Sequence, residues 1–125
     1  IICIHDAARP FIKSSYIKDS IDACREFDGA IIAIPAIDTV KKADNQIIKN
    51  TINRESLWMA QTPQTFKKEK LLHAIKICSH PSITDESMLM EKANYKIKLI
   101  LGDQSNFKIT NEIDWELAKV IVEGG

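Results

Sequence analysis

Two short apolar runs on either side of one helical stretch constrain the fold of this chain more than any other feature. The runs are Ile1–Ile4 and Ala30–Ile34. Each is continuously apolar, which is typical of strands buried on both faces of a parallel sheet. Residues 14–28 between them carry apolar side chains at helical spacing, and Gly29 is expected to end that helix. The order predicts an α/β domain whose first two strands form a parallel pair with a right-handed crossover.

A polar segment interrupts this pattern. Residues 39–43 and 47–52 are typical of two strands, and Asp44–Gln46 between them is a turn-forming cluster, so an antiparallel hairpin is predicted. A two-stranded ribbon is only marginally stable alone and needs a surface to pack against. We therefore expect an arm at about residues 37–57 that reaches a second subunit.

The remaining elements follow from periodicity and from residues that break regular structure. We expect a strand at 58–62 stopped by Pro63, a helix at 67–78, a break at Pro81, a helix after 84, a strand at 97–101 and a last helix after 110. The expected helix caps are Ser14 or Ser15, Thr84, and Thr110 or Asn111. The side chains expected to point inward are Ile17, Ile21, Cys24, Phe27, Leu71, Leu72, Ile75, Cys78, Met88, Leu89, Ala93, Ile113, Leu117, Val120 and Ile121.

Composition excludes several classes of function. Seventeen Lys and Arg balance seventeen Asp and Glu, which gives no general electrostatic reason to bind nucleic acid. No apolar run approaches the roughly 18 residues of a membrane span. The three cysteines lack metal-ligand or disulfide spacing and are expected to be reduced core residues of a cytoplasmic protein. Only Gly29 and Gly102 lie inside the chain, so a Gly-rich phosphate loop is absent from it.

The segment His5–Pro10 follows the first strand, where open α/β sheets bind their ligands. Asp6 there can coordinate Mg²⁺ or bind a ribose hydroxyl, and Arg9 can bind a phosphate oxygen. Equally, the two side chains can form an ion pair that only fixes the loop. No Ser or Cys nucleophile lies near His5 in the sequence, so a structural, hydrogen-bonded histidine is expected rather than a general base. His73 and His80 have no ligand-spaced partner, and surface or packing roles are expected for both.

Lys108 and two arm residues could bind an anion. Lys108 follows a predicted strand and precedes a helix N-terminus, a favourable place for a phosphate, although a solvated lysine fits the pattern equally well. Thr39 and Arg54 flank the hairpin, and antiparallel pairing would bring both to one end of the ribbon. Together they could hold a phosphate, whereas Thr39 alone is simply a good strand former. Gln64 is expected to cap backbone groups rather than contact a substrate.

Five motifs occur in a characteristic order: H-D-A-A-R-P, D-T-V-K-K, N-R-x-S-L-W-x-A-Q-T-P-Q-x-F, I-T-D-E and G-D-x-x-N-F-K-I-T. From residue 1 to about 122, the chain resembles the bacterial 2-C-methyl-D-erythritol 4-phosphate cytidylyltransferases. The resemblance implies a Rossmann-like nucleotidyltransferase fold with a mostly parallel sheet and a protruding β-hairpin arm. It also implies a homodimer of interlocking arms, and a reaction that joins CTP to the polyol phosphate and releases pyrophosphate in the non-mevalonate isoprenoid pathway.

The resemblance implies roles for residues at the nucleotide. Asp6 would contact CTP and its Mg²⁺, and would be the metal ligand. Ala7 and Arg9 would line the same pocket. Lys108 would position the substrate phosphate, whose oxygen attacks the α-phosphorus of CTP.

On the arm, the resemblance implies that Thr39 and Arg54 hold the substrate phosphate in the partner's site. Arg54 and Lys108 are therefore the candidate catalytic residues, because positioning and positive charge dominate phosphoryl-group chemistry of this kind. The expected partners are the two small-molecule substrates and a second copy of the chain.

The chain also departs from the family. The family begins with a strand and a Gly-rich loop, followed by Arg and Lys that stabilise the transition state, and nothing here matches them. Residues 1–125 would be the C-terminal portion of a single cytidylyltransferase domain, and we predict that they are inactive alone. Asn53 stands where Asp is frequent, and Phe107 where Ile or Val is usual.

Three other interpretations remain. A ribitol 5-phosphate cytidylyltransferase is the nearest enzyme, but that relative tends to read H-D-A-V-R-P, whereas this chain has Ala8. The chain could instead be a truncated, non-catalytic dimerisation module. Its polar loops could also serve only the fold.

Overall fold

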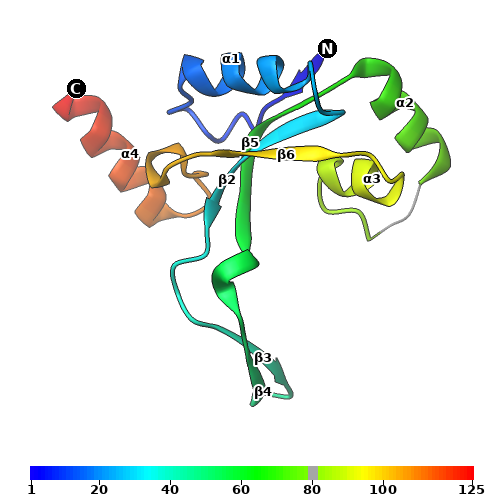
Figure 1. Cartoon of the computed structure of the whole chain (residues 1–125). Coiled ribbons are helices and arrows are strands. Elements are labelled where there is room, and N and C mark those ends of the chain that lie inside the picture. The colour runs from blue at the N-terminus through cyan, green and yellow to red at the C-terminus, as the bar shows by residue number, and fades with distance from the viewer. Residues whose placement is uncertain (79–81) are drawn as a thin grey trace.

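Four strands form one mixed sheet in the order β1-β5-β2-β6 (Figure 1). The computed structural model describes residues 1–78 and 82–125, so His80 and the predicted break at Pro81 lie outside the described residues. The strands are β1 (Ile2–Ile4), β2 (Gly29–Pro35), β5 (Trp58–Phe66) and β6 (Ile97–Leu101).

Strand directions in this sheet confirm the expected α/β class but not the expected first pair. β2 and β6 are parallel neighbours, and β5 runs antiparallel to both β1 and β2. Three of the four strands therefore share one direction. The prediction that the first two strands are neighbours is wrong, because β5 lies between them and supplies both hydrogen-bonded ladders.

β5 is longer than the sequence predicts. It was expected to end before Pro63 but continues to Phe66 through a cis Thr62–Pro63 bond. Its register with β2 shifts between Ile31, opposite Gln64, and Ala33, opposite Ala60. Pro63 lies in that irregular stretch, where the missing N–H of proline is tolerated.

In the described part of the chain, four α-helices lie around the sheet (Figure 1). They are α1 (Ser14–Ala23), α2 (Lys68–Ile77), α3 (Glu86–Lys92) and α4 (Glu112–Gly124). The core cluster of Ile31, Phe66, Leu71, Ala74 and Met90 joins β2 and β5 to α2 and α3. On the other face of β5, the hydroxyls of Thr65 and Ser20 in α1 form a buried hydrogen bond of 2.7 Å. The sheet is therefore packed on both faces.

The helix ends differ from the predicted ones in three places. α1 is capped by Lys13, without a side-chain bond, and stops at Ala23. Asp85 rather than Thr84 caps α3, through its bond to Met88 N. Asn111 caps α4, as one of the two predicted alternatives.

Many apolar side chains that were predicted to point inward are exposed. Ile113 is 80% exposed and Leu117 48%, and α4 buries only Ala118. The same correction applies to Ile17, Ile21, Leu72, Ile75, Val120 and Ile121. The accessible surface of 8569 Å² exceeds the roughly 6,700 Å² of a compact 14.1 kDa monomer. The spacing identified apolar positions correctly, but the described residues leave these side chains largely exposed.

Residues 40–52 form the predicted hairpin. β3 (Val40–Asp44) and β4 (Ile47–Ile52) pair with each other in a separate two-stranded sheet, which projects away from the rest of the molecule (Figure 1). Asn45 and Gln46 both have positive φ, as a two-residue hairpin turn requires. The hairpin is almost entirely exposed.

The expectation that the three cysteines are reduced core residues is only partly met. All three are free, but Cys24 alone is a core residue, since Cys3 is exposed and Cys78 is half-buried. In the described part of the chain, no helix has the length and apolar character needed to cross a membrane.

Asp103 connects α1 to the loop after β6. Its carboxylate accepts hydrogen bonds from Lys13, from Tyr16 at 2.7 Å and from the backbone and side chain of Ser105. The Lys13 ammonium, followed by Ser105 and Tyr16, lowers the pKa of Asp103 far below its usual range. Folding therefore stabilises the ionised carboxylate.

Gly29 does not end a helix as predicted. It opens β2, and a Cβ there would lie 2.4 Å from Phe66 Cδ1 and 2.9 Å from Thr65 O. We expect Gly29→Ala to lower the free energy of unfolding of this chain by about 1–3 kcal/mol, because β5 must move to admit the methyl group. Urea titration measures the change. Gly124→Ala is the control, because nothing lies within 4 Å of its added Cβ. Equal midpoints for the two variants would contradict the prediction.

Asp103→Asn should make stability less dependent on pH. The folded pKa of Asp103 lies below its unfolded value, so its contribution is complete above the unfolded pKa and is lost as the pH falls below about 4. At pH 7 we expect a loss of about 1 kcal/mol, since water screens a partly exposed carboxylate. Urea titrations of both proteins at pH 7 and pH 3 test this, with the exposed Asp19→Asn as control. The same difference at both pH values would refute the assignment.

Candidate functional site

The loop after β1 places Asp6 and Arg9 side by side. Arg9 N donates to Asp6 O at 3.0 Å, which closes a turn, and Arg9 Nε donates to Asp6 Oδ2 at 3.2 Å. The Arg9 side chain is only 12% exposed and that of Asp6 33%. The pair is thus held at the rim of the sheet with its Asp6 carboxylate reachable from solvent.

His5 and Thr62 fix this loop to the adjacent strand β5. His5 Nε2 is 2.9 Å from Arg9 O, and Nδ1 is 2.8 Å from Thr62 Oγ1. The same hydroxyl accepts the Asp6 backbone N–H at 3.0 Å. Both ring nitrogens of His5 are therefore engaged within the fold, and the expected structural role of His5 is confirmed. His73 packs against Tyr95, whose hydroxyl lies 2.6 Å from Nδ1, as expected for a packing residue.

Lys108 meets the same carboxylate from the loop after β6. Its Nζ lies 3.4 Å from Asp6 Oδ2, the oxygen that also accepts from Arg9. Ile109 N donates to Ala8 O at 2.8 Å, and the rings of Phe11 and Phe107 lie 5.6 Å apart, so the two loops are joined on both sides of Lys108. Asp6, Arg9 and Lys108 are thus brought together although about 100 residues separate them.

These three side chains line one polar cavity of about 430 Å³. The other residues that line it are Ala60, Gln61, Thr62, Gln64, Thr84, Asp85 and Glu86. The lining carries the two cations Arg9 and Lys108, which meet at Asp6, and two further acidic residues, Asp85 and Glu86. The cavity has room for a nucleotide or sugar phosphate, and a phosphate group can bind at the side where Arg9 and Lys108 meet.

Sequence reasoning missed the group that Gln64 organises in this cavity. Gln64 is 2% exposed, donates to Asp85 Oδ2 at 3.0 Å and accepts Ser87 N at 3.2 Å. Its expected role in capping backbone groups is confirmed. The T-P-Q and T-D-E segments contain Gln64 and Asp85, but the sequence does not show that the two segments lie close together.

Thr39 and Arg54 do not reach this cavity in the same chain. Both lie just beyond the last hairpin pair, Val40–Ile52, so the prediction that they share one end of the ribbon is confirmed. Arg54 is exposed and begins the short 3-10 turn η1 (Arg54–Ser56), whose cap is Asn53. Neither residue lines the polar cavity. Ala7 is exposed in the turn beside Asp6 and does not line that cavity either.

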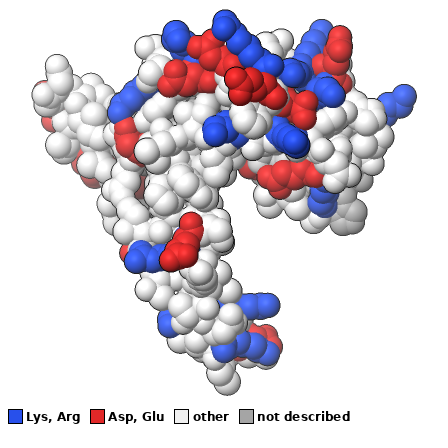
Figure 2. Space-filling model, in the orientation of Figure 1, with Lys and Arg blue, Asp and Glu red and all other residues white. Residues whose placement is uncertain are grey.

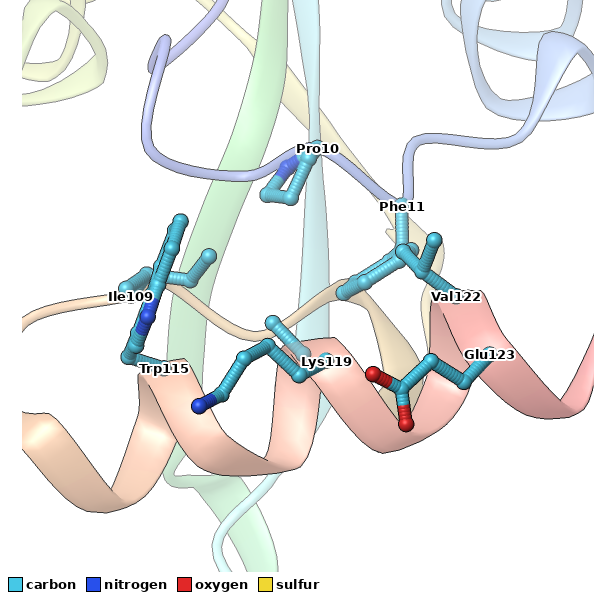
Figure 3. Close-up of a pocket in the computed structure, with 8 residues that line it drawn as sticks. Pro10, Phe11, Ile109, Trp115, Lys119, Val122 and Glu123 are labelled. Carbon is cyan, nitrogen blue, oxygen red and sulfur yellow. The ribbon is translucent and has the colours of Figure 1, made fainter.

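A second cavity, of about 330 Å³, lies between α4 and the chain at Pro10 and Phe11 (Figure 3). Trp115, Val122 and Ile109 form much of its wall, and Lys119 and Glu123 are its charged residues. Their opposite charges and the apolar wall make it unsuitable for a phosphate. On the face in Figure 2, Lys and Arg are interspersed with Asp and Glu and form no continuous basic surface.

Known proteins match this chain over nearly all of its length. The relative from Geobacter metallireducens, named 2-C-methyl-D-erythritol 4-phosphate cytidylyltransferase, is 38% identical over 125 residues, which is 98% of this chain and 54% of the relative. The relative of the same name from Fusobacterium nucleatum is 44% identical over 123 residues, covering 95% of this chain and 53% of the relative. The chain therefore spans about half the length of these curated relatives.

Two solved structures have the same fold, one named 2-C-methyl-D-erythritol 4-phosphate cytidylyltransferase and the other 4-diphosphocytidyl-2C-methyl-D-erythritol synthase. The Francisella tularensis enzyme superposes with a TM-score of 0.85 at 30% identity over 94% of this chain and 57% of its own. The Anaerococcus prevotii structure has a TM-score of 0.85 at 32% identity over 97% and 57%. The family described as IspD, 2-C-methyl-D-erythritol 4-phosphate cytidylyltransferase, matches residues 1–124, and this chain belongs to that family.

Proposed function

We propose that this chain forms the substrate-holding part of an enzyme that joins CTP to 2-C-methyl-D-erythritol 4-phosphate. The observation that carries the proposal is the meeting of Asp6, Arg9 and Lys108 at one polar cavity in a chain of this family. The products would be the CDP-linked polyol and pyrophosphate.

The proposed chemistry needs no protein nucleophile. A phosphate oxygen of the polyol phosphate forms a bond to the α-phosphorus of CTP, the bond to the bridging oxygen of pyrophosphate breaks, and pyrophosphate leaves. Catalysis then depends on positioning and on charge. Arg9 is held nearly buried by two hydrogen bonds, so its place is fixed before any ligand arrives. Lys108 is half exposed, so its ammonium can leave the Asp6 carboxylate and bind a phosphate instead.

Asp6 fits a Mg²⁺ ion that arrives with a nucleotide. Its Oδ2 is engaged by Arg9 and Lys108, and its side chain is one-third exposed. The described residues contain no cluster of three or more His, Cys, Asp or Glu that could hold a metal, and Mg²⁺ commonly uses one or two carboxylates together with substrate phosphates. When bound, the ion would neutralise charge on the phosphates of CTP.

The arm is proposed to act in the site of a second copy. Thr39 and Arg54 lie together at its base, away from the cavity of their own chain, and the hairpin has no packing partner in the described chain apart from its own two strands. A homodimer with exchanged arms would bury this ribbon and bring Arg54 to the substrate phosphate.

The whole activity is proposed to require more than this chain. The chain spans about half of its curated relatives and contains no Gly-rich loop. Three free cysteines support a reducing, cytoplasmic location. Ribitol 5-phosphate is the alternative substrate, and a truncated dimerisation module is the non-catalytic alternative.

A pyrophosphate-release assay tests the function directly. A full-length enzyme that contains residues 1–125 should turn over CTP with 2-C-methyl-D-erythritol 4-phosphate, and ribitol 5-phosphate should be a much poorer substrate. Residues 1–125 alone should give negligible turnover, because they supply only one side of the site. Full turnover by the isolated chain, or a preference for ribitol 5-phosphate, would contradict the proposal.

Lys108→Ala and Arg54→Ala in that full-length enzyme should each lower kcat/KM for the polyol phosphate by about 10²-fold or more, with little change in thermal stability. The exposed Lys119→Ala, whose partner is Glu116, is the control and should change neither.

Mixing Lys108→Ala with Arg54→Ala tests whether the arm acts in the site of the partner subunit. A hybrid dimer would contain one site with both residues intact, so roughly a quarter of the normal activity should return after subunit exchange. No recovery in a mixture that demonstrably exchanges subunits would place Arg54 in the site of its own chain.

A further inference from the structure

Asn106 is a buried residue on which several parts of the polar site converge. It is 0% exposed, it lies two residues before Lys108, and it ends the short 3-10 turn η2 (Gln104–Asn106). Its side-chain Nδ2 donates to Thr62 O at 2.9 Å and to Gln61 Oε1 at 3.1 Å. Its backbone carbonyl accepts a hydrogen bond from Arg9 Nη1 at 2.7 Å. One residue thus contacts β5, Arg9 and the loop that carries Lys108.

The Asn106 amide is only half satisfied. Its Oδ1 is buried and has no hydrogen-bond partner among the described residues. An unpaired buried polar atom opposes folding, so an apolar side chain of similar size would remove that cost. What the amide contributes therefore lies in the two groups that its N–H bonds hold.

Gln61 completes the connection. It is 5% exposed, and its Nε2 donates to Asp103 O at 3.1 Å while its Oε1 accepts from Asn106. A Cβ on Gly102 would lie 2.7 Å from that Oε1, so the glycine leaves the space that the Gln61 amide occupies. The two amides hold both ends of the segment 103–106 against β5.

We infer that Asn106, together with Gln61, is a positioning residue that sets Lys108 at the phosphate site. The expected effect on kcat/KM rests on the proposed function, whereas the expected effect on the position of Lys108 does not. Asp6 N donates to Thr62 Oγ1, and Asn106 Nδ2 donates to Thr62 O. Both loops are therefore attached to the same residue of β5, which holds Lys108 and Asp6 at a fixed separation. Loss of the bond should free Lys108 from the 3.4 Å contact with Asp6.

The test compares Asn106→Leu, and Asn106→Ala if leucine fails to fold, with Ser20→Ala in the full-length enzyme. Ser20 is also 0% exposed, and its hydroxyl donates to Ile17 O at 2.9 Å and lies 2.7 Å from Thr65 Oγ1, but it belongs to α1. It therefore reports the effect of losing a buried polar group away from the site.

The first measurement does not need activity. The rate at which acetic anhydride acetylates Lys108, followed by peptide mass spectrometry, should rise severalfold in the Asn106 variants and stay unchanged in Ser20→Ala. Unchanged acetylation of Lys108 in the Asn106 variants would overturn the inference, whatever the reaction of the enzyme proves to be.

The second measurement is a double-mutant cycle. Asn106→Leu should lower kcat/KM for the polyol phosphate by about tenfold in the wild-type background, but by less than about twofold in Lys108→Ala, because the residue acts through Lys108. Equal losses in both backgrounds, or an equal loss in Ser20→Ala, would show a merely structural role. Absence of turnover in the wild type would instead refute the proposed function and leave acetylation to decide the positioning.

Discussion

The insertion of β5 between β1 and β2 is the constraint on which the site depends. Because β5 is antiparallel to both neighbours, β1, β2 and β6 run in one direction and end at the same edge of the sheet. The loop with Asp6, the arm and the loop with Lys108 leave from those three ends. β5 enters the sheet at that edge, which places Thr62 where it can bond to the first of these loops and to Asn106. β5 thus holds residues that are far apart in the chain at fixed positions relative to one another.

Electrostatics act locally in this protein. The net charge is zero, and the charges on the face in Figure 2 are mixed. Yet Arg9 and Lys108 share one oxygen of Asp6 at the rim of a polar cavity. An arriving phosphate can replace the carboxylate as the partner of Lys108 without the cost of desolvating an isolated ammonium. Such an arrangement suits a reaction in which positioning and charge replace a nucleophile.

The exposed apolar side chains and the projecting hairpin are both surfaces that the described chain leaves uncovered. The faces of α4 and α2 have the spacing of core helices, and the accessible surface is larger than that of a compact monomer of this mass. The hairpin is likewise a ribbon without a packing partner in the described chain. Both features agree with a chain that spans about half of its curated relatives.

The sequence by itself determined the class of fold, most of the elements, the hairpin and the candidate residues Asp6, Arg9 and Lys108, because periodicity and short motifs are local properties. It also indicated that His5 and Gln64 serve the fold. Only the tertiary structure decided that β5 separates β1 from β2, that Pro63 lies within a strand, and that many apolar side chains of α1, α2 and α4 are exposed. It alone revealed Asn106 and Gln61. These outcomes depend on which segments meet across long sequence separations, and burial and hydrogen bonding between distant residues leave no periodic signal in the chain.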